Sequence, residues 1–225
     1  MLTEILARPF RWLVGKMAAG LAATGVHPNF LTWLCLALNL WAGVLFAAGR
    51  FAAAGTMMIA AGFCNLMDGP VARIQGRVSE FGAFLDSILD RYADLVIFLG
   101  LLVYYARVNR FLYTVVVGAA MAGAVMVSYA EARAESLIDS ARVGFWERPE
   151  RIVLIILGAL ANRMPLVLWI LAIGPNITVI HRILHTWRQT EGRLRAKQEP
   201  AEQPAAPAEP VAEARVLTRT AGHGD

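Results

Sequence analysis

Apolar residues recur in long blocks along most of the chain, with short polar stretches between them. A helix needs about 20 mainly apolar residues to span a bilayer. The blocks occupy residues 29–49, 51–70, 82–105, 110–132, 151–163 and 165–186. The fifth block, which contains IVLIILGALANR, is the shortest. This pattern predicts an all-α membrane protein with six transmembrane helices.

The two ends of the chain have a different pattern. Residues 1–19 place apolar side chains at helical spacing among basic ones, which predicts an amphipathic juxtamembrane helix on the inner membrane surface. A helix packed on the protein itself is the alternative. Residues 189–225 are rich in Pro, Ala and Glu and lack apolar periodicity, so we expect a disordered cytoplasmic tail. The six-helix domain is expected over residues 20–188.

Composition supports this assignment. Hydrophobic residues make up 57% of the chain and charged residues 17%, whereas soluble domains have about 25% charged residues. With the N-terminus inside, 16 of the 21 Lys and Arg residues fall on the inner side and four on the outer. Because basic residues favour the cytoplasmic side, we expect both termini in the cytoplasm and the protein in the inner (plasma) membrane. Cys35 and Cys64 are expected to be reduced residues within spans.

Several carboxylates lie within or beside the apolar segments. Asp86, Asp90 and Asp94 follow one another at intervals of four residues, which places them close to one face of a helix. Three like charges on one face repel one another, so a compensating cation is expected. A single intramembrane Asp also serves as a helix–helix anchor, and this alternative applies to Asp94.

The preceding helix supplies further oxygen atoms. Asn65 and Asp68 lie one turn apart on it, and a short loop would bring them beside the other carboxylates. Such hard oxygen ligands suit Mg²⁺ or Mn²⁺, and two ions could hold a phosphate. Gly69 and Gly82 allow a close approach to the backbone, and Arg73 is suited to binding a phosphate.

These residues carry a family resemblance. The segment NLMDGPVAR, then eight residues, then GAFLDSILD resembles the signature of the CDP-alcohol phosphatidyltransferases at every position but the first, where Asn65 replaces Asp. HPNFLT resembles the family's entry to its first span. The segments VSYAEARAESL, GFWERPERIV and VIHRILHTW resemble the bacterial branch that makes phosphatidylinositol phosphate.

The resemblance implies a dimeric six-helix enzyme that transfers a phosphatidyl group from CDP-diacylglycerol to an alcohol and releases CMP. It implies Asp90 as the general base and a pair of divalent metal ions, Mg²⁺ or Mn²⁺. The metal ligands would be Asn65, Asp68, Asp86 and Asp90. The CDP-linked lipid would contact Asn29, Phe30, Leu31, Thr32, Gly69, Arg73 and Ser79. No nucleic-acid partner is expected.

The acceptor is the open part of this interpretation. Inositol 1-phosphate is the first choice, and a basic cluster is available for its phosphate: Arg133, Arg148, Arg151 and Arg182. However, Glu131 stands where the phosphatidylinositol-phosphate branch carries a Lys. Glycerol 3-phosphate and free inositol are therefore alternatives. A catalytically inactive member, suggested by Asn65, and a cation transporter, suggested by the intramembrane acids, are the other interpretations.

Overall fold

The structure is a computed structural model that describes residues 2–138 and 143–198. Within this part of the chain it contains seven α-helices and no strand, as predicted for an all-α protein. The helices are α1 (Leu2–Ala23), α2 (Pro28–Ala47), α3 (Phe51–Ile74), α4 (Glu80–Arg107), α5 (Phe111–Glu135), α6 (Arg148–Leu160) and α7 (Met164–Gln198).

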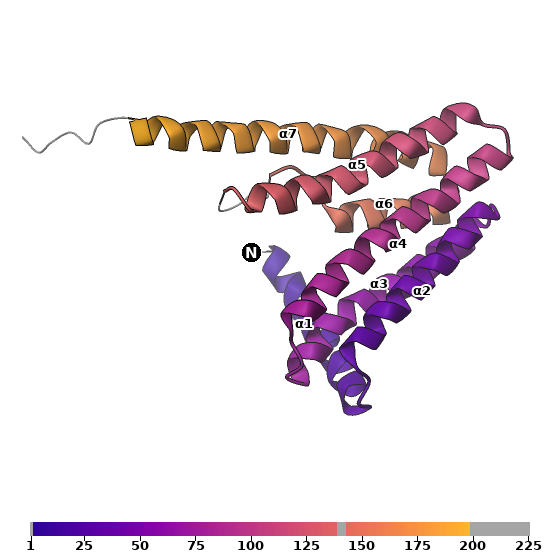
Figure 1. The fold of residues 1–225 in the computed structure, drawn as a ribbon. Helices are drawn as coiled ribbons and strands as arrows, with labels where there is room; N and C mark the ends of the chain where they lie inside the picture. The colour runs from indigo at the N-terminus through magenta and orange to yellow at the C-terminus, as the bar shows by residue number, and fades with distance from the viewer. Residues whose placement is uncertain (1, 139–142, 199–225) are drawn as a thin grey trace, which may run out of the picture.

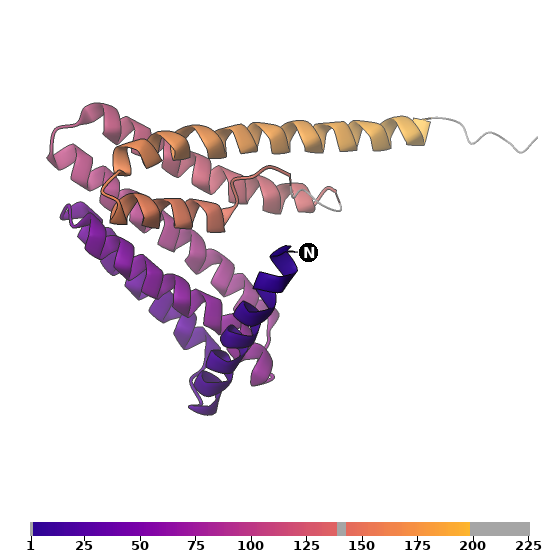
Figure 2. The ribbon, with the colours of Figure 1, turned by 180° about the vertical axis from the view of Figure 1, so that it is seen from behind.

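The helices form two groups (Figure 1). Helices α2, α3 and α4 run side by side in one group, and α5, α6 and α7 form the other. Contacts of α4 with α5 and of α3 with α6 join the groups. The view from behind shows α1 crossing in front of the first group, where it packs on α3 (Figure 2). The sites described below lie within the first group and between the two.

Helix α1 packs on the protein, which is the second of the two interpretations offered for it. Ala18 is fully buried, and Val14 and Leu21 pack with it against the protein. Trp12 and Leu13 lie on the other side and are at least half exposed. One face of α1 therefore packs on α3, and another offers apolar side chains of the kind that enter a membrane interface.

Six helices follow α1, but only part of the six-span prediction is confirmed. Four helices are long and apolar enough to cross a membrane: α2, α3, α5 and residues 164–193 of α7. Helix α4 has 28 residues but contains several charged residues. Helix α6 has 13 residues, which is about 20 Å of helix at 1.5 Å per residue.

The boundary predicted for the tail is wrong over residues 189–198. Helix α7 continues to Gln198, because this stretch is rich in good helix formers and contains no proline. Arg193 Nη1 also donates a 2.8 Å hydrogen bond to the Leu137 carbonyl oxygen near the end of α5. Residues 199–225 lie outside the described part of the chain.

Helices α2 and α4 approach each other closely at Gly43 and Gly100. A Cβ atom on Gly100 would overlap the backbone oxygen of Gly43. We therefore expect Gly100→Ala to force the helices apart and to destabilise the protein by about 1–3 kcal/mol. Unfolding in detergent would measure this effect. Gly118→Ala on α5 is the matched control because nothing lies within 4 Å of its Cβ position. Equal stability of the two variants would contradict the prediction.

Candidate functional site

A cavity of about 360 Å³ lies where the first turns of α2 and α4 meet the end of α3. His27 Nδ1 accepts a 3.2 Å hydrogen bond from the Asn29 backbone N–H at the start of α2. Ser79 Oγ accepts a 3.0 Å hydrogen bond from the Gly82 backbone N–H at the start of α4. These caps fix two helix N-termini beside the cavity, and helix N-termini favour phosphate groups.

The cavity gathers most of the residues predicted to contact a CDP-linked lipid. Those that line it are Asn29, Thr32, Gly69, Arg73 and Ser79. Phe30 and Leu31 do not line it. The Phe30 side chain is 58% exposed, whereas Leu31 is buried in a cluster with Met67 and Val71. Helical geometry explains the difference, because successive residues point in different directions around the helix axis.

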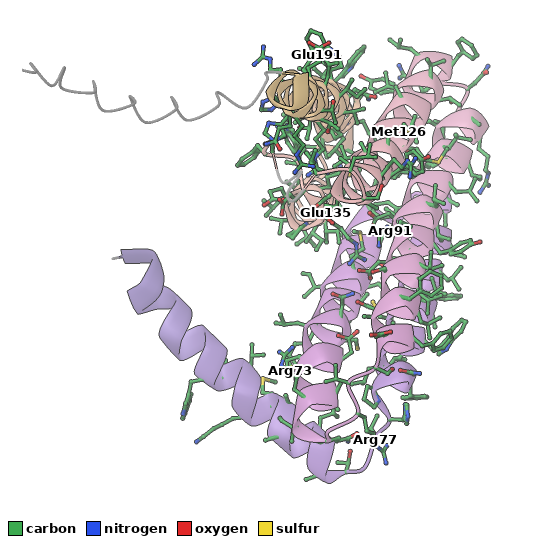
Figure 3. All side chains as sticks on the ribbon, turned by 60° about the vertical axis from the view of Figure 1, so that its left-hand side comes forward. Arg73, Arg77, Arg91, Met126, Glu135 and Glu191 are labelled. Carbon is green, nitrogen blue, oxygen red and sulfur yellow. The ribbon has the colours of Figure 1, made fainter. Side chains whose placement is uncertain are left out.

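Arg77 lines the same cavity and was not singled out from the sequence. It lies in the loop between α3 and α4, four residues after Arg73. Figure 3 shows both arginines at the same end of the structure, far from Glu191 on α7. The signal in the sequence was a second basic residue in the short loop beside Ser79.

Asp68 and Asp86 face this cavity from α3 and α4. The backbone N–H of Gly69 donates a 2.6 Å hydrogen bond to Asp68 Oδ1. Among the described residues, Asp68 Oδ2 and Asp86 Oδ1 are buried oxygens with no hydrogen-bond partner. A buried carboxylate oxygen without a partner is costly, so each is suited to a cation or a donor brought by a ligand.

Both carboxylate oxygens of Asp90 have a partner. The Asn65 amide donates a 2.8 Å hydrogen bond from Nδ2 to Asp90 Oδ1, which joins α3 to α4. Arg148 Nη1 forms a 2.5 Å ion pair with Asp90 Oδ2, which joins α4 to α6. The side chain of Asp90 is 16% exposed. Asp90 therefore lies at the meeting point of three helices.

Asp94, one turn further along α4, anchors α6. Arg148 Nε and Arg151 Nη2 pair with its two oxygens at 3.2 and 3.1 Å. The side chain of Arg151 is 2% exposed. Asp94 thus has the helix–helix role that was one of the two interpretations of its sequence position.

Within the described residues, no three or more His, Cys, Asp or Glu side chains lie close enough together to hold a metal ion. Asp90 is paired with the Arg148 guanidinium. The unpartnered oxygens of Asp68 and Asp86 nevertheless have the donor chemistry that Mg²⁺ and Mn²⁺ favour. Metal binding by Asn65, Asp68, Asp86 and Asp90 stays a prediction.

A second cavity of about 200 Å³ borders Asp90, between α4, α5 and α6. Its polar lining comes from all three helices and from the residue that precedes α6. These residues are Asp90, Arg91, Asp94, Ser128, Glu131, Glu147, Arg148 and Arg151. Asp90 is thus accessible from a cavity that a second substrate could occupy.

The four arginines predicted for the acceptor phosphate divide into two pairs. Arg148 and Arg151 line the cavity beside Asp90. Arg133 and Arg182 instead line a mostly apolar cavity between α5 and α7. Arg133 donates to Ser136 Oγ at 3.3 Å, whereas Arg182 is buried and forms a 2.9 Å ion pair with Glu131. The cluster expected from the sequence is therefore not assembled around one cavity.

Comparison with known proteins assigns this arrangement to a family. Residues 25–187 match the family described as CDP-alcohol phosphatidyltransferase. The chain is 35% identical to the phosphatidylinositol phosphate synthase of Streptomyces avermitilis, with 84% of each chain covered. It is 33% identical to the archaetidylinositol phosphate synthase of Pyrococcus horikoshii, over 78% of this chain and 92% of that one.

Solved structures agree. The Mycobacterium tuberculosis phosphatidylinositol phosphate synthase with CDP-DAG bound has a TM-score of 0.72 and 28% identity, covering 77% of this chain and 93% of that one. The same enzyme in complex with manganese and citrate has a TM-score of 0.71, covering 77% and 88%. Sequence and fold together show that this chain belongs to the CDP-alcohol phosphatidyltransferase family.

Proposed function

We propose that this protein transfers a phosphatidyl group from CDP-diacylglycerol to an alcohol in the membrane and releases CMP. The observation that carries the proposal is the placement of Asp68 and Asp86 in a cavity with the other signature residues, while Asp90 borders a second cavity. A substrate in the first cavity and a substrate in the second could therefore meet near Asp90. The bound CDP-DAG in a structural neighbour supports the choice of donor.

The proposed roles follow from the positions of the two cavities. The CDP-linked lipid would occupy the first, with Arg73 and the N-termini of α2 and α4 near its diphosphate. The acceptor would occupy the second. Asp90 would take the proton of the acceptor hydroxyl as that oxygen attacks the lipid-side phosphorus. The bond from this phosphorus to the CMP oxygen breaks, and CMP leaves. Asp90 must exchange its contact with Arg148 for the acceptor hydroxyl.

The oxygens of Asp68 and Asp86 in the first cavity suit divalent metal ions, because each residue offers one without a partner among the described residues. The full ligand set would be Asn65, Asp68, Asp86 and Asp90, and Asn65 and Asp90 would have to exchange their present contacts to join it. When bound, Mg²⁺ or Mn²⁺ would supply positive charge for the diphosphate and for the charge that develops on CMP. The manganese complex of a structural neighbour supports a divalent cation in this fold.

Inositol 1-phosphate is the first acceptor to test. Relatives named archaetidylinositol phosphate synthase and phosphatidylinositol phosphate synthase support it, and the second cavity contains Arg148 and Arg151. Glycerol 3-phosphate and free inositol are the alternatives. Purified protein with labelled CDP-diacylglycerol, Mg²⁺ and each acceptor should release CMP with at least one of them. Absence of CMP release with the whole panel would contradict the proposal and favour an inactive member of the family.

Asn65→Asp should strengthen the response to Mg²⁺. In the structure the Asn65 amide donates to Asp90, whereas an aspartate there would repel it unless a cation lay between them. We expect the Mg²⁺ concentration for half-maximal activity to fall severalfold and the rise in Tm on Mg²⁺ addition to increase. An unchanged Mg²⁺ requirement together with an unchanged Tm response would count against Asn65 as a ligand.

The proposed membrane arrangement has six spans in the cell's inner (plasma) membrane, with both termini in the cytoplasm, and the proposed assembly is a homodimer. The distribution of basic residues supports the orientation. Both proposed sites then lie toward the cytoplasmic side, where soluble acceptors and CMP are found.

A further inference from the structure

The cavity proposed for the acceptor has a charge balance that does not favour an anion. Carboxylates from Asp90, Asp94, Glu131 and Glu147 line it, and they outnumber the guanidinium groups of Arg91, Arg148 and Arg151. A phosphate site normally presents an excess of donors and positive charge. A phosphorylated acceptor would therefore enter a cavity in which carboxylates outnumber guanidinium groups.

The guanidinium groups of this cavity are already bound. Arg148 pairs with Asp90 and Asp94, and Arg151 pairs with Asp94 and donates to the Trp146 carbonyl oxygen at 3.3 Å. Arg91 donates to the carbonyl oxygen of Ser87 on its own helix. A phosphate that bound here would compete with Asp90 and Asp94 for Arg148 and Arg151.

Arg182 lies outside the lining of this cavity and is joined to it through an ion pair with Glu131. Glu131 lines the cavity with a side chain that is 27% exposed, whereas Arg182 has no exposed side-chain surface and does not line it. Their ion pair is 2.9 Å long. Arg182 also donates to the carbonyl oxygens of Val127 at 2.7 Å and Val143 at 3.1 Å. One nitrogen, Nη2, is buried without a partner among the described residues.

We infer that Glu131 is a specificity-determining residue of the acceptor site. Its carboxylate pairs with the Arg182 guanidinium, which an acceptor phosphate would need, and so weakens the binding of phosphorylated acceptors. Two effects act together. The carboxylate repels an incoming phosphate, and it also holds Arg182, which a phosphate could otherwise reach. The inference rests on the proposed function, and among the candidate acceptors it favours an uncharged polyol such as free inositol.

Glu131→Gln tests this directly. The amide has nearly the same shape and still offers an oxygen to Arg182, but it carries no charge. We expect the KM for inositol 1-phosphate to fall at least tenfold, while the KM for CDP-diacylglycerol and the KM for free inositol stay within twofold. The ratio of kcat/KM for the phosphorylated over the free acceptor should therefore rise at least tenfold. An unchanged or lower ratio would overturn the inference.

Glu147→Gln is the matched control. It removes one negative charge from the same cavity, whereas the ion pair of Arg182 is with Glu131. For Glu147→Gln we expect the ratio of kcat/KM for inositol 1-phosphate over free inositol to change less than threefold. An equal rise in both variants would show that the total charge of the cavity decides specificity and would overturn the role of the Glu131–Arg182 pair.

The wild-type protein gives a second test that needs no variant. If Glu131 acts as inferred, inositol 1-phosphate has a KM no lower than that of free inositol. A wild-type KM for the phosphorylated acceptor at least tenfold lower would overturn the inference. Failure of the proposed function would look different, because no acceptor would then release CMP.

Discussion

Asp90→Asn should release CMP about 100- to 10,000-fold more slowly than the wild-type protein, the range that loss of a general base produces. Asparagine has nearly the same shape as aspartate and can accept a hydrogen bond from Arg148, but it cannot take the proton of the acceptor hydroxyl. The loss should appear in kcat. The KM for CDP-diacylglycerol should change less than kcat, because Asp68, Asp86 and Arg73 remain in the cavity proposed for that substrate.

The controls for this variant are its folding and a nearby carboxylate. Gel filtration and thermal unfolding in detergent should show a folded protein, since Arg148 keeps its contact with Asp94. Glu147→Gln, which alters the same cavity without removing a partner of Asp90, should keep most of its kcat. CMP release by Asp90→Asn at an undiminished rate would show that the general base is another group.

Asp94→Leu should lower the free energy of unfolding by about 3–5 kcal/mol, the loss found when one partner of a buried ion pair is removed. Arg151 is 2% exposed and has Asp94 as its carboxylate partner, so the variant leaves a buried guanidinium uncompensated. Arg148 loses one contact but retains Asp90. Unfolding by denaturant in detergent micelles would measure the change.

The double variant Asp94→Leu, Arg151→Met separates the ion pair from packing. Replacing both buried charges by apolar side chains removes the uncompensated guanidinium, so most of the lost stability should return. If the free energy of unfolding of Asp94→Leu lay within about 1 kcal/mol of the wild-type value, the anchoring role of Asp94 would be contradicted. A double variant no more stable than the single one would show that Asp94→Leu acts through some other contact.

Much of the candidate site could be predicted from local sequence. Spacing of four residues placed Asp86, Asp90 and Asp94 close to one face of α4, and the same geometry put Asn65 and Asp68 one turn apart on α3. The short connection between these helices predicted that they lie side by side. In the structure each of them packs on α2, and the hydrogen bond from Asn65 to Asp90 joins them directly. The glycine and arginine positions that border the first cavity followed from the same signature.

The differences between expectation and structure have local and non-local causes. Phe30 and Leu31 belong to a contiguous motif but do not line the first cavity, because a helix turns consecutive residues to different sides. Their contact with the lipid stays a prediction. The predicted tail was placed too early because residues 189–198 lack apolar periodicity, although they form helix well. The four arginines divide between two cavities for another reason, since no local pattern shows which guanidinium meets which carboxylate.

The sequence by itself determined the helices, their apolar faces and the stripe of acids, because all of these depend on residues within one or two helical turns. Only the tertiary structure decided that Arg148 pairs with Asp90, that Asp94 anchors α6 and that Glu131 holds Arg182. These partners are separated by about 50 or more positions along the chain. Their pairing depends on the packing of α6 against α3, which places α6 beside Asp90 and Asp94, and of α5 against α7. The spacing of residues within any one helix does not contain that information.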